Sequence, residues 1–198
     1  MGLREAKKEQ MRRRLYESAM ALFRERGFAE TRVRDVITAV DVSEATFFNY
    51  FPTKEAVLHE ASVETKRFYG AYLQNLVNRS DERADDRLRE LARVAASVFA
   101  DDRAFMAIVL THTDLFFGSA GKDLDLANYE LLTEIFRQGQ RKGEFGSRHD
   151  PQQLAEIFNA TQLLTILNWT IEWFDEATPG IDDRTVAAID VVLRGCAA

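Results

Sequence analysis

The 198-residue sequence has few of the residues that support covalent or metal chemistry. Its one cysteine, Cys196, cannot form an intrachain disulfide. The three histidines, His59, His112 and His149, stand on separate segments without metal-ligand spacing. Glycine-rich phosphate loops, Walker lysines and nucleophile elbows do not occur. The sequence therefore predicts a non-enzyme without cofactor or metal, and an enzyme with a pocket around His112 is the alternative.

Proline, glycine and long hydrophobic runs are also scarce. Three prolines and ten glycines disfavour a β-rich protein with many turns. The longest charge-free run on the most apolar segment, residues 157–171, contains three side-chain amides and is too short and too polar to span a bilayer. The N-terminus is charged rather than apolar, so we expect no signal peptide. These absences predict an all-α, cytoplasmic protein with no membrane partner.

The net charge of −6 is distributed unevenly. Residues 1–60 carry 11 basic and 10 acidic side chains, whereas the remainder carries 15 and 22. Within residues 1–14, six basic residues face two acidic ones. Positive charge is therefore gathered at the N-terminal end, which suits contact with nucleic acid better than the total charge suggests.

Residues 31–56, TRVRDVITAVDVSEATFFNYFPTKEA, predict two short helices, a tight turn and the abrupt start of a third helix. The first helix has four apolar residues at helical spacing: Val33, Val36, Ile37 and Val40. Asp41 tolerates the left-handed conformation of a tight turn, and Ser43 is a suitable N-cap for the second helix. Pro52 forces that helix to end just before it. The pattern is that of a helix-turn-helix.

The second of these helices has an unusual outward face. Phe47 and Phe51 share its inward side, whereas Ala45, Phe48 and Asn49 point away from the core. Apolar side chains can touch a thymine methyl group, and an amide can pair with adenine. This face therefore favours contact with DNA bases, and the alternative is a small amphipathic helix with one exposed aromatic residue.

The rest of the chain predicts further helices, about nine in all. Residues 53–78 form a long helix that links the N-terminal unit to the C-terminal segments. Apolar residues at helical spacing then mark five of these segments: 86–99, 104–117, 124–142, 151–174 and 184–195. Asp150 before Pro151 is a typical capped helix start. We place the domain boundary at Pro52, between residues 1–52 and 53–198.

The segment 151–174 is apolar on most of its circumference in its second half. A helix of this kind needs a second packing partner besides its own domain. Together with the final helix it predicts a four-helix bundle with a second copy of the chain, through Leu164, Leu167, Trp173, Val186, Ile189 and Leu193. Deep burial within a monomer is the alternative.

Residues 9–60 resemble the TetR family of bacterial transcriptional regulators. The matching string is a helix ending in ALFRERGFAET, followed by VRDVITAVDVSEATFFNYFPTKEAVLHEA. The resemblance implies a three-helix DNA-binding domain and a C-terminal helical domain that binds a ligand and dimerises. It implies a repressor that binds double-stranded DNA at a palindromic operator as a homodimer and is released by a small, largely apolar effector. An all-helical adaptor that binds protein through Phe48 is the alternative.

The resemblance also implies roles for individual residues. Contacts to DNA are implied for Thr31, Arg32, Arg34, Ser43, Glu44, Ala45, Thr46, Phe48, Asn49, Tyr50 and Lys54. The family often has tyrosine where Phe48 stands, so we expect an apolar contact there. Candidates for the effector pocket are Phe99, Phe105, Met106, Val109, Thr113, Phe116, Phe117, Tyr129, Phe136, Gln162, Leu163, Ile166 and Trp169.

Overall fold

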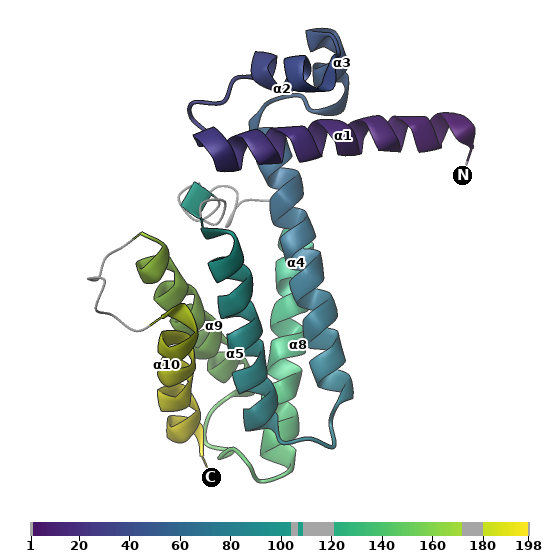
Figure 1. Cartoon of the computed structure of the whole chain (residues 1–198). Helices are drawn as coiled ribbons and strands as arrows, with labels where there is room; N and C mark the ends of the chain where they lie inside the picture. Colours follow the sequence, from purple (N-terminus) through teal and green to yellow (C-terminus); the bar gives the residue numbers. More distant parts are fainter. Residues whose placement is uncertain (1, 104–106, 109–120, 172–179, 198) are drawn as a thin grey trace.

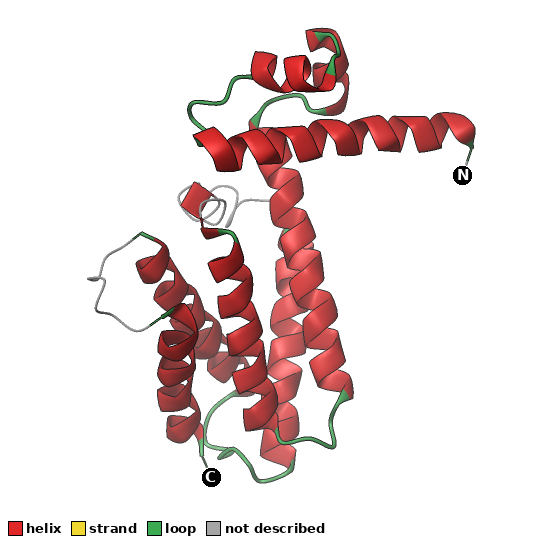
Figure 2. Cartoon of the chain, in the orientation of Figure 1, coloured by secondary structure: helices red, strands yellow, loops and turns green. Residues whose placement is uncertain are grey.

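The computed structural model describes residues 2–103, 107–108, 121–171 and 180–197. These residues form eight α-helices and no strand, with one isolated bridge between Phe145 and Ala197 (Figures 1 and 2). The predicted all-α class is confirmed. The helix expected over residues 104–117 lies almost wholly outside the described residues. None of the helices in the described ranges is both long and apolar enough to cross a membrane.

The N-terminal unit consists of α1 (Leu3–Arg26), α2 (Val33–Val40), α3 (Glu44–Tyr50) and the first turns of α4 (Glu55–Asn78). Helix α1 crosses the start of α4. Helices α2 and α3 lie on the side of α1 that faces away from the C-terminal helices (Figure 1). Their apolar faces meet in one core, whose buried members include Leu15, Phe23, Val36, Phe47, Phe51, Leu58 and Ala61. The core therefore extends into α4, and this helix belongs to both halves of the molecule.

The turn between α2 and α3 has the predicted local structure. Asp41 adopts the left-handed conformation with φ of 58°. The Ser43 hydroxyl accepts a hydrogen bond from the Thr46 backbone N–H at 3.1 Å, which caps α3. At the start of α2, Arg32 is the N-cap residue, and its backbone N–H donates to the Asp35 carboxylate at 2.8 Å.

The C-terminal unit packs the rest of α4 against four further helices: α5 (Ala84–Asp101), α8 (Lys122–Arg141), α9 (Pro151–Thr170) and α10 (Ile181–Cys196). Helix α8 lies along α4, while α10 packs against α5 and α9 (Figure 1). Gly70 allows the close approach of α4 and α8, because a Cβ atom there would stand 2.3 Å from the Asn128 side-chain oxygen. As predicted, Asp150 caps α9 by accepting from the Gln152 N–H at 2.9 Å.

Candidate nucleic-acid interface and effector cavity

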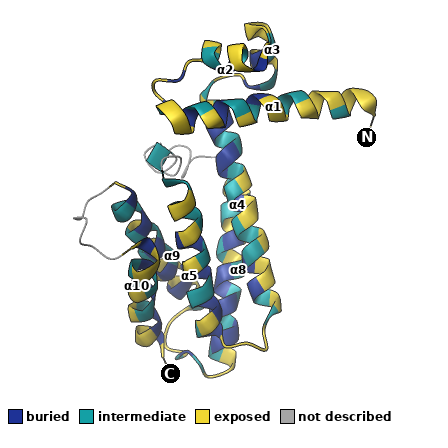
Figure 3. Ribbon diagram, in the orientation of Figure 1, coloured by how far each residue is buried: buried dark blue, intermediate teal, exposed yellow. Residues whose placement is uncertain are grey.

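Helix α3 presents the outward face that the sequence predicts. Phe47 is fully buried, while Phe48 is 43% exposed and Ala45 and Asn49 are also exposed. The colouring of α3 shows both buried and exposed residues on this helix (Figure 3). The ring of Phe47 packs edge to face against that of Phe48, with centroids 5.5 Å apart. The exposed Phe48 ring therefore packs against a ring that belongs to the core.

Two arginines of α1 hold the C-terminal ends of the short helices. The Arg14 guanidinium donates to the Val40 carbonyl at 3.1 Å, and Arg12 donates to the Tyr50 carbonyl at 3.0 Å. Arg12 also pairs with Glu60 of α4. Helix C-terminal carbonyl groups carry partial negative charge and lack partners within the helix, so cations stabilise them. These two side chains therefore fix α2 and α3 on α1.

Two residues for which the resemblance implies phosphate contacts are turned inward. The Lys54 ammonium donates to the carbonyl oxygens of Phe28 at 2.6 Å and Thr31 at 2.9 Å, and it lies 4.0 Å from the centre of the Phe28 ring. Thr31 is fully buried, and its hydroxyl donates to the Gly27 carbonyl at 2.8 Å. In this conformation both residues join α1, α2 and α4. Burial of Thr31 contradicts a contact between its side chain and DNA, whereas a contact from the half-buried Lys54 stays a prediction.

The other candidates for DNA contact lie at or near the surface. Arg32, Arg34, Ser43 and Glu44 are exposed, while Thr46 and Tyr50 are half-buried. These residues belong to the start of α2 and to α3, so they share one end of the molecule (Figure 3).

The C-terminal unit encloses a cavity of about 590 Å³ between α4, α5, α8 and α9. Its volume lies within the range of about 300–1,000 Å³ typical of small-molecule sites. The lining from α5 is apolar: Leu91, Val94, Ala95, Val98 and Phe99. The lining from α4 and α8 is mixed: Ser62, Thr65, Lys66, Phe68, Tyr69, Tyr72, Lys122, Asp125, Asn128, Tyr129 and Leu132. Helix α9 adds Asn159, Gln162, Leu163 and Ile166.

The predicted pocket residues fall into three groups. Five of them line the cavity: Phe99, Tyr129, Gln162, Leu163 and Ile166. Phe136 lies instead in the core, fully buried against Phe145 and Phe158, and Trp169 packs beneath the Arg103 guanidinium. Six lie outside the described residues: Phe105, Met106, Val109, Thr113, Phe116 and Phe117.

Sequence reasoning predicted Tyr129 and Gln162 but missed the other polar residues of the cavity wall, including Lys66, Tyr69, Asp125 and Asn128. The Lys66 ammonium lies 2.6 Å from the Asp125 carboxylate, and the Asn128 amide donates to the Lys66 carbonyl at 3.0 Å. The Tyr69 hydroxyl donates to the Gln162 side-chain oxygen at 3.4 Å, and burial raises the pKa of Tyr69. The available signal was a lysine within the apolar face of the linking helix.

One side chain joins the cavity to the N-terminal unit. Phe99, near the end of α5, lines the cavity and also packs against the N-terminal core. One turn further on, the Asp102 carboxylate pairs with the Arg24 guanidinium of α1 at 2.5 Å. The two halves of the molecule are therefore connected through the end of α5 as well as through α4.

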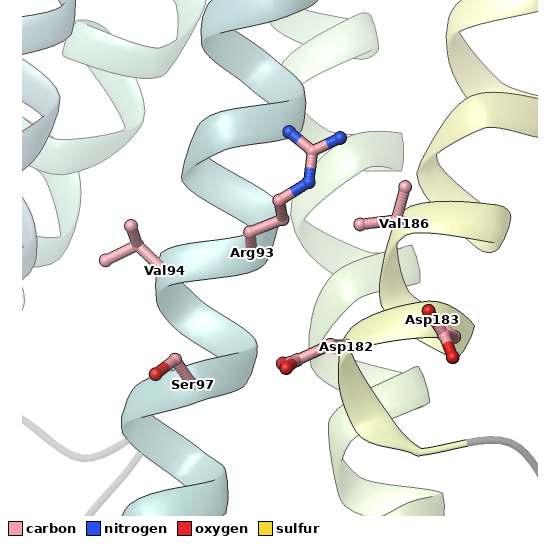
Figure 4. Close-up of a pocket in the computed structure, with 6 residues that line it drawn as sticks. All are labelled: Arg93, Val94, Ser97, Asp182, Asp183 and Val186. Carbon is pink, nitrogen blue, oxygen red and sulfur yellow. The ribbon is translucent and has the colours of Figure 1, made fainter.

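A second hollow, of about 410 Å³, lies between α5 and α10 (Figure 4). Arg93, Val94 and Ser97 line it from α5, and Asp182, Asp183 and Val186 line it from α10. The arginine and both aspartates are exposed, so this surface hollow lacks the apolar wall of the larger cavity. The larger cavity is the candidate effector site.

The exposed part of α9 carries a line of large apolar side chains. Ile157 and Leu164 of α9 and its C-cap residue Ile171 are spaced seven residues apart and are 52%, 56% and 42% exposed. On α10, Val191 is 71% exposed. An apolar stripe at heptad spacing is typical of a helix that packs against another helix.

The predicted dimer contacts are only partly on this surface. Leu164 is exposed, Leu167 and Val186 are half-buried, and Trp173 lies outside the described residues. Ile189 and Leu193 are buried in the protomer's own core, which corrects their assignment to the interface. The reason is that the face of α10 that carries Thr185, Ile189, Leu193 and Cys196 turns inward.

Sequence comparisons agree with this arrangement. The signature of bacterial regulatory proteins of the tetR family matches residues 15–61, and that of the tetracyclin repressor-like C-terminal domain matches residues 81–196. The transcriptional regulator LuxR of Vibrio harveyi is 23% identical over 156 residues, which cover 75% of this chain and 73% of LuxR.

Solved structures show the same fold. The TetR-family repressor FadR of Thermus thermophilus, in complex with lauroyl-CoA, is 25% identical with a TM-score of 0.69, over 93% of this chain and 94% of FadR. FadR of Bacillus subtilis, in complex with stearoyl-CoA, is 17% identical with a TM-score of 0.69, over 92% and 97% of the two chains. The helix-turn-helix, the cavity and both family signatures together show that this chain belongs to the TetR family of bacterial regulatory proteins, which are DNA-binding regulators rather than enzymes.

Proposed function

We propose that this protein is a repressor that binds a palindromic operator as a homodimer and is released by a small, largely apolar effector. The observation that carries the proposal is the outward face of α3, where Ala45, Phe48 and Asn49 are exposed on a capped and packed helix. A helix of this kind fits the major groove, where Asn49 pairs with adenine and Phe48 contacts a thymine methyl group. The exposed Arg32 and Arg34 contact phosphates.

The experiment is selection of duplexes from a random pool, followed by titration of the selected sequence at several salt concentrations. We expect a palindromic sequence and an affinity that falls steeply as salt rises, because phosphate contacts release counterions. Asn49→Ala and Phe48→Ala should change sequence preference. Leu126→Ala is the matched control, because Leu126 is also exposed but lies on α8 and does not line the cavity. Absent or salt-insensitive binding would refute the proposal and favour the protein-binding adaptor.

The homodimer is supported by the exposed apolar stripe on α9. Two copies that pack α9 and α10 against each other bury Ile157, Leu164 and Ile171 in a four-helix bundle. Leu164→Glu should convert the dimer to a monomer in analytical ultracentrifugation. Leu126→Glu is the matched control, since Leu126 is 60% exposed on α8. An unchanged sedimentation coefficient for Leu164→Glu would exclude this interface.

The effector site is supported by the volume and the apolar α5 wall of the cavity. The lauroyl-CoA bound by FadR of Thermus thermophilus supports an effector with an apolar chain. Occupation of the cavity acts on DNA binding because Phe99 touches both the cavity and the N-terminal core. Release requires the effector to bind more tightly to the conformation that does not fit the operator.

A further inference from the structure

The cavity contains a hydrogen-bond donor that the described residues leave unpaired. Gln162 is only 4% exposed, and its Nε2 group has no hydrogen-bond partner among the described residues. Its side-chain oxygen accepts from the Tyr69 hydroxyl, so the amide is held at one end only. A buried N–H group without an acceptor is unfavourable, and it therefore favours a ligand that brings an oxygen acceptor.

Lys66 places a positive charge in the same cavity wall. Its side chain is 9% exposed, whereas that of its partner Asp125 is 39% exposed. A buried ammonium group needs an anion close to it. When an anion from within the cavity replaces Asp125 beside Lys66, the Asp125 carboxylate can be solvated by water. Loss of the ion pair therefore costs Asp125 less free energy than it would cost the buried Lys66. Lys122 lines the same wall and adds to the positive field.

The part of the wall that α5 contributes is mainly aliphatic. Leu91, Val94, Ala95 and Val98 follow one another at spacings of three, one and three residues, which places them on one face of α5. A continuous apolar stripe of this kind buries a chain of methylene groups favourably. The cavity therefore offers an aliphatic surface from α5, a cation from α4 and an unpaired amide from α9.

We propose that the effector is an aliphatic carboxylate whose oxygens bind Lys66 and Gln162 while its chain lies along α5. Asp125 then competes with the ligand for the Lys66 ammonium, and the Lys66–Asp125 ion pair breaks when the ligand binds. The inference rests on the proposed function, since it names the chemical class of the effector for the same cavity. The carbonyl of a thioester is neutral and cannot replace the Asp125 charge beside Lys66, so a thioester of the same acid is an alternative outcome of the test.

Isothermal titration calorimetry on the full chain without DNA tests the head group. The probes are dodecanoate, dodecanol, dodecyltrimethylammonium and dodecanoyl-CoA, each below its critical micelle concentration. We expect dodecanoate to bind roughly 10- to 100-fold more tightly than dodecanol, as for a hydrogen bond to a charged group, and the ammonium compound to bind most weakly. Equal affinities for dodecanoate and dodecanol would overturn the inference. Tighter binding of dodecanoyl-CoA than of dodecanoate would overturn the carboxylate head group, and the reverse supports it.

Three variants test the residues. Lys66→Met should weaken dodecanoate binding roughly 10- to 100-fold and leave dodecanol unchanged, and Gln162→Leu should weaken dodecanoate binding roughly tenfold. Asp125→Asn should strengthen dodecanoate binding, because it removes the competitor. This opposite sign cannot come from misfolding, so unchanged or weaker binding in Asp125→Asn would overturn the inference. Lys142→Met is the matched control outside the cavity.

Separate measurement of DNA binding distinguishes this inference from the function on which it rests. A protein that binds its selected duplex but none of the four probes would overturn the carboxylate effector and leave the DNA-binding regulator intact. A protein that binds dodecanoate as expected but selects no duplex would overturn the proposed repressor and support the ligand site.

Discussion

Both halves of the molecule contain ion pairs, such as Arg12 with Glu60 and Arg13 with Glu17 in the N-terminal unit, but the two short helices are also held at their ends by basic side chains. In the N-terminal unit, Arg12, Arg14 and Lys54 donate to backbone carbonyl oxygens near the ends of α1, α2 and α3. In the C-terminal unit, arginines pair mainly with carboxylates: Arg79 with Glu82 and Glu90, Arg89 with Asp85 and Asp190, and Arg137 with Glu134.

Helix length explains the difference. Helices α2 and α3 have eight and seven residues, so the carbonyl groups without an intrahelical partner are a large share of each. Helices of 16–24 residues in the C-terminal unit have long packed faces, and side-chain ion pairs on their surfaces contribute little to stability. Short helices need side chains that hold their ends, whereas long helices are held by packing.

The largest expected effect is on the small core. Phe47→Ala should lower the free energy of unfolding of the N-terminal unit by about 3–5 kcal/mol, because Phe47 is fully buried there. Hydrogen exchange followed by mass spectrometry should show loss of protection in residues 3–50 and little change in α8–α10. Phe48→Ala is the control, with little loss of stability expected. Equal loss of protection in both halves would show that they unfold as one unit and would break the comparison.

Lys54→Ala comes next. It leaves the Phe28 and Thr31 carbonyl oxygens without this donor and removes the contact with the Phe28 ring, so we expect a loss of about 2–3 kcal/mol in chemical unfolding. DNA affinity should fall alike for all sequences. Unchanged stability with a smaller salt dependence of DNA binding would instead restore Lys54 to the phosphate contacts that the sequence predicts.

The ion pairs of the C-terminal unit should make stability depend on pH, and for Glu90 we expect a change in the free energy of unfolding of about 1 kcal/mol or less. A hydrogen bond from Arg79 lowers the pKa of Glu90. A lowered pKa in the folded state adds stability above the ordinary value of about 4, and this contribution is lost as pH falls through the folded-state pKa. Glu90→Gln should therefore be less stable than the wild type at pH 7, with a smaller difference at pH 3. A difference that does not depend on pH would show that the charge of Glu90 is irrelevant.

The smallest effect on stability is expected for Arg32→Ala. Arg32 is exposed, so the change in unfolding free energy should stay within about 0.5 kcal/mol. DNA affinity should nevertheless fall, and the slope of log affinity against log salt should decrease by about one. Together with Lys54→Ala, this variant separates a cation that contacts phosphate from one that holds the fold. A large loss of stability in Arg32→Ala would show that Arg32, like Lys54, stabilises the fold.

Local features of the helix-turn-helix were predictable from the sequence. Asp41 in the left-handed conformation, Ser43 as the cap of α3 and Asp150 as the cap of α9 all depend on neighbours within four residues. Short-range geometry of this kind follows from residue type and spacing. The exposure of Phe48 follows in the same way, because helical periodicity alone places it opposite the core.

Contacts between distant segments were not predictable. Lys54 reaches carbonyl oxygens 23 and 26 residues away, and Lys66 reaches Asp125 across 59 residues. Nothing in the spacing of these residues shows which helices lie side by side. Ile189 and Leu193 illustrate the same point, because periodicity identifies the apolar face of α10 but does not show whether its own protomer or a partner covers that face.

The position of Phe99 has a consequence for cooperativity. A ligand that moves this ring alters the packing of the cavity and of the N-terminal core together. Coupling of binding free energies is reciprocal, so an effector that weakens operator binding by a given factor is itself bound more weakly by that factor when the operator is occupied. In the cell, the abundance of operator sites relative to protein would then shift the effector concentration at which the response occurs.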